Sequence, residues 1–150
     1  MARRLQAAGY PLTVWNRTKE EASGLPSAGA RWGDSPKAVG RGSDVVITMC
    51  TDSAASEEVI CGGEWGSGRG TPGLDGYRLG KHRSGNVKAI AERARAKGIP
   101  MLDAPVTGNP KVAAEGKLGI MVGGPKETFD ACFPIFEKMA VKIFHAARGT

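Results

Sequence analysis

The chain has 150 residues, 41% hydrophobic and 24% charged, with a formal net charge of +6. This length suits one domain with its own core. We expect no membrane partner, because no apolar run approaches the roughly 20 residues of a membrane span. We also expect no signal peptide, because residues 1–10 lack a continuous apolar core. The charge either favours anionic ligands, such as a carboxylate or a cofactor phosphate, or is a solvated basic surface. We expect no nucleic acid partner, because no basic run carries interleaved aromatic residues.

The chain contains three cysteines, an odd number, and their spacing is not that of metal ligands. They are Cys50, Cys61 and Cys132. This usage is typical of a reducing compartment rather than of a disulfide framework. We therefore predict a cytoplasmic protein without a bound metal.

The first third of the chain alternates helical and strand patterns. Residues 1–9 read as a helix that stops at Gly9, and Pro11 to Trp15 alternates like a short strand. Ser35-Pro36 has the form of an N-cap followed by a first helical residue. Asp44 to Met49 is a β-branched run, which indicates a buried parallel strand.

The rest of the chain continues this alternation, which predicts a mostly parallel α/β sheet. In the helix at Asn86 to Lys97 we expect Ala89, Ile90 and Ala94 to point inward and Gly98 to end the helix. The other predicted elements are helices at Ser53 to Ile60 and from Pro125, and strands at Met101 to Asp103, Leu118 to Val122 and Val141 to Phe144.

One segment interrupts the alternation. The stretch 62–85 holds nine glycines together with Pro72 and has almost no apolar run, so we expect it to supply no buried strand. Two explanations remain open. One is a coding frame that was shifted and then restored, and the other is a genuine loop insertion.

The most informative motif is Asp103-Ala-Pro-Val-Thr-Gly-Asn109, which follows the strand predicted at Met101 to Asp103. Ligands of open α/β sheets bind at the carboxyl ends of strands, and this motif puts a hydroxyl and a bare backbone amide there. From the residues alone, the alternative is a simple turn. The motif resembles the substrate-binding signature of the β-hydroxyacid dehydrogenases, the family of 3-hydroxyisobutyrate dehydrogenase and 6-phosphogluconate dehydrogenase. That family usually has Ser at Thr107 and Gly at Asn109.

The resemblance implies that Thr107, Gly108 and Asn109 bind the substrate. The hydroxyl of Thr107 would donate a hydrogen bond, and the amides of Gly108 and Asn109 would complete a cradle for a carboxylate.

The resemblance also implies a cofactor site built from two loops. Asn16, Arg17 and Thr18 follow the second strand of the family's Rossmann fold. An acidic residue there holds the ribose hydroxyl of NAD, whereas an arginine accepts the 2′-phosphate of NADP. We therefore predict NADP, with NAD as the other candidate.

The second cofactor loop is Met49-Cys50-Thr51, which ends the next strand where the family often has Met-Leu-Pro. From its chemistry alone, Cys50 also reads as an ordinary buried thiol.

The family pattern has parts with no counterpart here. In the family a strand and a Gly-x-Gly-x-x-Gly turn precede the position of Met1, and a catalytic lysine lies on a long helix beyond the position of Thr150. We therefore expect an incomplete NAD(P)-binding Rossmann-like domain over residues 1–150, without its first strand, one central strand and the C-terminal helical domain. No catalytic residue is assigned.

The function implied is NAD(P)-dependent oxidation of a small 3-hydroxy acid, or reduction of its semialdehyde. We expect this chain alone to be inactive, and the full-length family protein allows a homo-oligomer. The alternative is a non-catalytic remnant or an interaction domain of the same fold.

Overall fold

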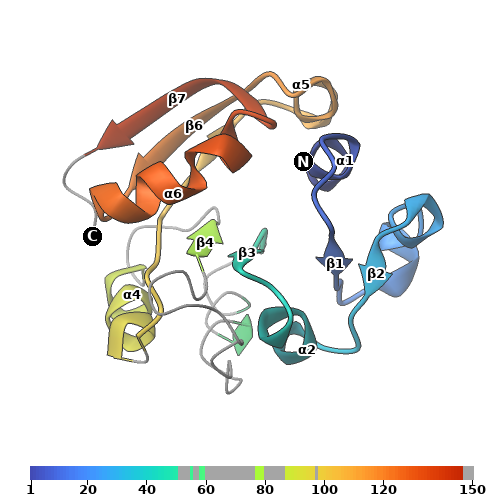
Figure 1. Cartoon of the computed structure of the whole chain (residues 1–150), viewed down its shortest axis with the longest axis horizontal. Helices are drawn as coiled ribbons and strands as arrows, with labels where there is room; N and C mark the ends of the chain where they lie inside the picture. The colour runs from blue at the N-terminus through green and yellow to red at the C-terminus, as the bar shows by residue number, and fades with distance from the viewer. Residues whose placement is uncertain (51–54, 56–57, 60–76, 80–86, 97, 147–150) are drawn as a thin grey trace.

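The structure, a computed structural model, describes residues 1–50, 55, 58–59, 77–79, 87–96 and 98–146 (Figure 1). Its helices and strands alternate along most of the chain. In order they are α1 (Ala2–Ala7), β1 (Thr13–Val14), β2 (Arg31–Trp32), α2 (Pro36–Arg41), β3 (Val45–Ile47), β4 (Tyr77–Leu79), α4 (Val87–Ala96), β5 (Val106–Thr107), α5 (Pro110–Glu115), β6 (Leu118–Gly123), α6 (Lys126–Phe136) and β7 (Ala140–Ala146), with short 3-10 turns at Lys19–Ala22 and Pro26–Ala28.

The described strands form three separate sheets with the orders β1-β2, β3-β4 and β5-β6-β7. Strand β1 runs parallel to β2, β3 parallel to β4, and β6 parallel to β7, while β5 runs antiparallel to β6. The prediction of a mostly parallel α/β fold is therefore confirmed. None of the described helices is long and apolar enough to cross a bilayer.

The main core lies between α6 and the inner face of β6 and β7 (Figure 1). Leu118, Ile120 and Val122 alternate inward along β6, as the two-residue period of a strand requires. The inward face of α6 supplies Phe129, Cys132 and Phe136. The cluster is completed by Leu5, Leu102, Ala104, Met139 and Ala140.

Local signals in the sequence located several element ends correctly. The hydroxyl oxygen of Ser35 accepts a hydrogen bond from the amide of Ala38 at 3.1 Å, so Ser35 caps α2 as predicted. Gly9 and Gly98 follow α1 and α4 with φ angles of +86° and +71°, in the left-handed region that glycine favours.

The strand predicted at Met101 to Asp103 is wrong. Met101 and Leu102 are buried as expected, but the only pairing in this segment is an isolated antiparallel bridge between Asp103 and Gly123. The segment is apolar because it packs into two cores, since Met101 belongs to a second cluster with Ile90 and Ala94 of α4. Burial therefore explains its composition without a regular ladder.

The glycine-rich stretch, predicted to supply no buried strand, does contribute a short strand. Tyr77–Leu79 pairs in parallel with Val45–Ile47, so one strand of the sheet comes from within 62–85. The strand has only three residues, Tyr-Arg-Leu, and the high glycine content of the whole stretch gave no indication of so short an element. In α4, Ile90 and Ala94 are buried as predicted, but Ala89 is exposed.

Candidate functional site

Thr107 lies within a strand rather than beyond the end of one. It is the second residue of β5 and pairs with Gly119 of β6. Its hydroxyl donates a hydrogen bond to the carbonyl oxygen of Gly119 at 3.4 Å. A Cβ atom at position 119 would lie 2.6 Å from the Thr107 Oγ1 atom, so the bare glycine makes room for the threonine side chain. The hydroxyl is thus exposed at a defined place on the sheet.

Gly108 turns the chain from β5 toward α5. Its φ angle is +141°, a conformation that side-chain-bearing residues rarely adopt. A Cβ atom here would lie 2.8 Å from the Cδ2 atom of Leu118 and 3.1 Å from a methyl of Val112. Both the backbone angle and the packing therefore require glycine, and the turn is exposed beside Thr107.

Asn109 has a structural role that the sequence reasoning missed. Its side-chain oxygen accepts a hydrogen bond from the amide of Val112 at 3.0 Å and so caps α5, with Pro110 as the first helical residue. The same pairing of a capping residue with proline was recognised at Ser35-Pro36, so the signal for α5 was present. The side-chain oxygen of Asn109 therefore has its partner within the fold.

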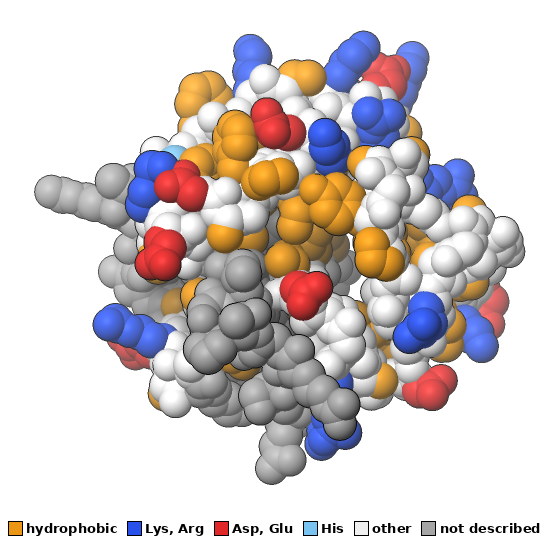
Figure 2. Space-filling view, in the orientation of Figure 1, with side chains coloured by type: hydrophobic (Ala, Val, Ile, Leu, Met, Phe, Trp, Pro, Cys, Tyr) orange, Lys and Arg blue, Asp and Glu red, His pale blue; other side chains and the backbone are white. Residues whose placement is uncertain are grey.

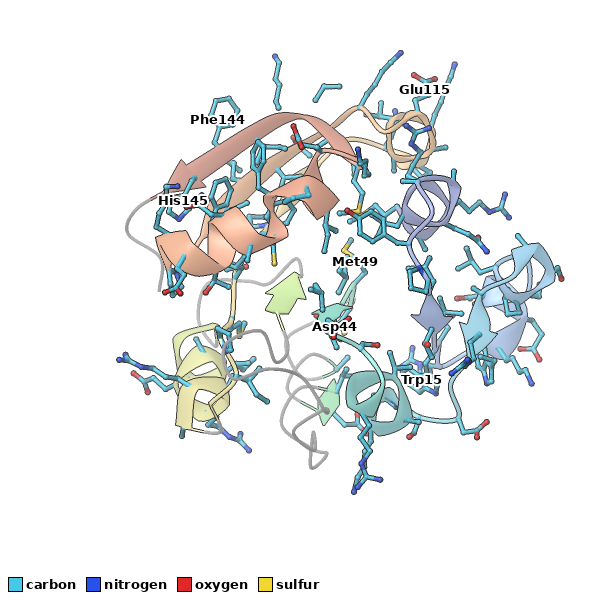
Figure 3. All side chains as sticks on the ribbon, viewed as in Figure 1. Trp15, Asp44, Met49, Glu115, Phe144 and His145 are labelled. Carbon is cyan, nitrogen blue, oxygen red and sulfur yellow. The ribbon has the colours of Figure 1, made fainter. Side chains whose placement is uncertain are left out.

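The loop after β3 lies near the centre of the molecule. Met49 is 54% exposed, and Figure 3 labels it between β3 and α1. Figure 2 shows hydrophobic side chains gathered at the centre of the same face. Cys50 is partly exposed, so the reading of it as a buried thiol is wrong. Thr51 lies outside the described residues.

The loop after β1 is held by its own hydrogen bonds. The side-chain nitrogen Nδ2 of Asn16 donates hydrogen bonds to the carbonyl oxygen of Thr18 at 2.8 Å and to the carboxylate of Glu21 at 3.1 Å. Asn16 therefore shapes the loop, while Arg17 and Thr18 are exposed. An exposed guanidinium and hydroxyl directly after a parallel strand fit the ribose phosphate end of a nicotinamide cofactor.

Aromatic packing fixes the turn that follows this loop. The ammonium of Lys19 lies 5.3 Å from the ring centre of Trp32 in β2, a cation–π contact that ties the turn to the sheet. The contact leaves Lys19 facing the aromatic ring.

The buried titratable groups near the sheet support the fold and not a reaction. Burial raises the pKa of the Cys132 thiol to about 12, which keeps it protonated and unreactive. The ring of His145 stacks on Phe129 with centroids 4.5 Å apart, and its Nε2 atom lies 3.0 Å from the carbonyl oxygen of Gly124. His145 thus joins β7 to the turn before α6.

The three groups of predicted site residues remain separate. Within the described part of the chain, no hydrogen bond or ion pair joins residues 16–18, 49–50 and 107–109 to one another. The described residues also include no group of three or more acidic, histidine or cysteine side chains that could hold a metal ion.

Comparison with known proteins covers nearly the whole chain. Residues 1–147 match the family described as the NAD binding domain of 6-phosphogluconate dehydrogenase. The chain is 38% identical over 95% of its length to the uncharacterized oxidoreductase YkwC of Bacillus subtilis, covering 50% of that protein. It is 36% identical over 97% of its length to the NAD-dependent L-serine dehydrogenase of Pseudomonas aeruginosa, covering 49% of that protein.

Among solved structures, the chain resembles Mycobacterium tuberculosis 3-hydroxyisobutyrate dehydrogenase with L-serine. The TM-score is 0.89 at 26% identity, over 99% of this chain and 50% of that one. The chain therefore spans about half the length of the relatives it matches.

Proposed function

Because this chain belongs to the β-hydroxyacid dehydrogenase family, we propose that it carries cofactor and substrate elements of an NAD(P)-dependent oxidoreductase acting on a small 3-hydroxy acid or its semialdehyde. L-serine and 3-hydroxyisobutyrate are the substrates that the names of similar proteins suggest, and each has a hydroxyl on the carbon β to a carboxylate. When bound, NAD(P)+ would accept a hydride from the carbon that bears this hydroxyl.

The observation that carries the substrate part is the turn from Thr107 to Gly108. The turn exposes a hydroxyl, and the glycine leaves the backbone without a side chain beside it. A hydroxyl and backbone amides are the donors that a carboxylate needs, and on binding the Thr107 hydroxyl would turn from the carbonyl oxygen of Gly119 to the carboxylate. In this proposal Thr107 and Gly108 bind the substrate carboxylate. Asn109 contributes its backbone amide, because its side chain caps α5.

The cofactor part rests on Arg17 and Thr18. Their exposed side chains would donate hydrogen bonds to the 2′-phosphate of NADP, while Asn16 holds the loop in shape. Met49, Cys50 and Thr51 would border the cofactor from the next strand. NADP is the favoured cofactor because arginine pairs with a phosphate dianion more strongly than with a ribose hydroxyl.

We further propose that this chain alone does not turn over substrate. In the described part of the chain, the hydroxyl of Thr107 bonds only a backbone carbonyl, and no acid or base is paired with it. The described strands β1 and β3 are also not hydrogen-bonded to each other, as expected if a strand belongs between them. The alternative function is a non-catalytic domain of the same fold, and the predicted cytoplasmic location stays a prediction.

A fluorescence titration of the purified chain with NADPH and NADH tests the proposal. We expect weak binding that favours NADPH. Arg17→Ala should weaken NADPH binding about tenfold, which corresponds to about 1.4 kcal/mol of binding free energy, and should leave NADH binding unchanged. Lys37→Ala, which removes a charge from α2 rather than from this loop, is the matched control.

If Arg17→Ala lowered the affinity for NADPH and for NADH equally, the assigned role of Arg17 would be excluded. No binding of either cofactor at millimolar concentration would favour the non-catalytic alternative. Turnover of L-serine or 3-hydroxyisobutyrate with NADP+ would contradict the proposed inactivity of the chain.

A further inference from the structure

Strand β7 is the last strand of the three-stranded sheet that the structure describes. Its seven residues, Ala140–Ala146, pair with β6 on one side, and among the described residues no other strand pairs with it. Such an edge presents a row of backbone donors and acceptors that another strand can use. The ring of His145 points toward α6, while Phe144 points away from it on the opposite face (Figure 3).

The face of the sheet that points away from α6 is unusually apolar. Phe144 is 62% exposed, and its partner across the ladder, Met121 of β6, is 50% exposed. Val141, at the bulge where β7 begins, is 66% exposed. Large apolar side chains that are adjacent and exposed mark a contact surface more often than single exposed ones do.

We propose that β7 pairs with β7 of a second copy of this chain, in antiparallel orientation about a two-fold axis at Ile143. The two sheets then join into one, and the backbone groups of both edges are satisfied. Because residues opposite each other share a face, Lys142 lies beside the partner's Phe144, and Phe144 beside the partner's Lys142.

Charge disfavours two alternative pairings of β7, and the axis at Ile143 adds a favourable contact. Lys142 is the one residue of β7 with a permanent charge. An axis at Lys142, or a parallel pairing in register, would set the two lysines opposite each other, and like charges in that position are destabilising. The axis at Ile143 instead sets each ammonium beside an exposed aromatic ring, where a cation–π contact forms. The alkyl part of Lys142 covers the ring of the partner's Phe144.

Sedimentation equilibrium of the purified chain tests the proposal through two opposite substitutions at one exposed site. Phe144→Lys places a second cation against Lys142 of the partner subunit and should weaken the dimer by at least about tenfold. Phe144→Glu places an anion there and should keep the dimer within about threefold of the original affinity at low salt, with weakening as salt is added. Circular dichroism should be unchanged in both, because the side chain is exposed.

Three results would overturn the proposal. A chain that stays monomeric at all concentrations would mean that the charge of Lys142 prevents β7 from pairing with another strand. A dimer that Phe144→Lys leaves intact would place the contact elsewhere. Equal disruption by Phe144→Lys and Phe144→Glu would exclude this register.

Discussion

Residues 101–146 and residues 1–50 use their apolar side chains differently. All buried members of the main core except Leu5 lie between Leu102 and Ala140. Residues 1–50 form two-residue strands β1 and β2 and contribute mostly half-buried side chains, such as Tyr10, Leu12 and Ile47, to the same core. Two-stranded sheets are marginal by themselves. The proposed substrate turn is thus built on the packed region, and the proposed cofactor loops lie on the loosely packed one.

The connection between the two regions is α1. Leu5 is 5% exposed and reaches the core of the C-terminal region. A Cβ atom on Gly116, after α5, would lie 2.7 Å from the Nε atom of Arg4, so the guanidinium packs directly on that turn. Helix α1 therefore supplies the fully buried part of this connection, beside the half-buried Tyr10, Leu12 and Ile47.

The largest expected loss of stability comes from the packed region. Phe136→Ala removes a fully buried ring and should lower the free energy of unfolding by about 3–5 kcal/mol. Phe133→Ala, on the same helix but half-buried, is the matched control and should cost about 1–2 kcal/mol. Urea denaturation followed by circular dichroism measures both. Equal losses would mean that the core is not centred on Phe136.

Leu5→Ala tests the connection. It should cost about 2–3 kcal/mol and loosen residues 1–50 more than residues 101–146. Leu25→Ala, which removes a half-buried leucine outside the main core, should cost less than about 1 kcal/mol. Limited proteolysis with mass spectrometry locates the first cleavages. Cleavage that begins in β6 or α6 of Leu5→Ala would contradict the assigned role of α1.

Gly108→Ala tests the proposed substrate turn against Gly98, another glycine with a positive φ angle. Gly98 also has a positive φ, but a Cβ atom there would meet nothing within 4 Å, so Gly98→Ala should cost about 1 kcal/mol. Gly108→Ala adds the contact with Leu118 and should cost about 2–3 kcal/mol. Thermal and urea unfolding give the difference. A smaller loss for Gly108→Ala would show that the turn relaxes easily.

The last expected effect is a dependence of stability on pH, which appears only in alkaline solution. Burial raises the pKa of Cys132 from 9.0 to about 12, so the folded state favours the protonated thiol. The stability from this group is complete below pH 9 and is lost as pH rises toward 12. The free energy of unfolding should therefore fall more steeply above pH 9 in the original chain than in Cys132→Ala. If the free energy of unfolding fell equally steeply with pH in both chains, Cys132 would not be the group responsible.

Local rules predicted the elements whose signals lie within a few residues. The cap at Ser35, the stops at Gly9 and Gly98, the strand at Leu118 to Val122 and the helix from Pro125 all survive in the structure. These features depend on short-range geometry, which the sequence contains directly.

Elements that depend on distant partners were not predictable in the same way. Strands β2 and β5 have two residues each, too few for a period to appear, and exist because β1 and β6 pair with them. Likewise, the chain at Met101 is buried between two clusters, and its composition resembled that of a strand. For the site, the motif located Thr107 and Gly108, but nothing in it indicated that Gly119 would make room for the threonine.

Native-state hydrogen exchange followed by mass spectrometry tests the central claim, that the packed region with the proposed substrate turn supports the loosely packed region with the proposed cofactor loops. We predict that α6, β6 and the amides of β7 that pair with β6 exchange only through global unfolding, while β1, β2 and β3 exchange much faster through local opening. Leu5→Ala should accelerate exchange in the second group alone. Equal protection of the two regions in the original chain would contradict the account.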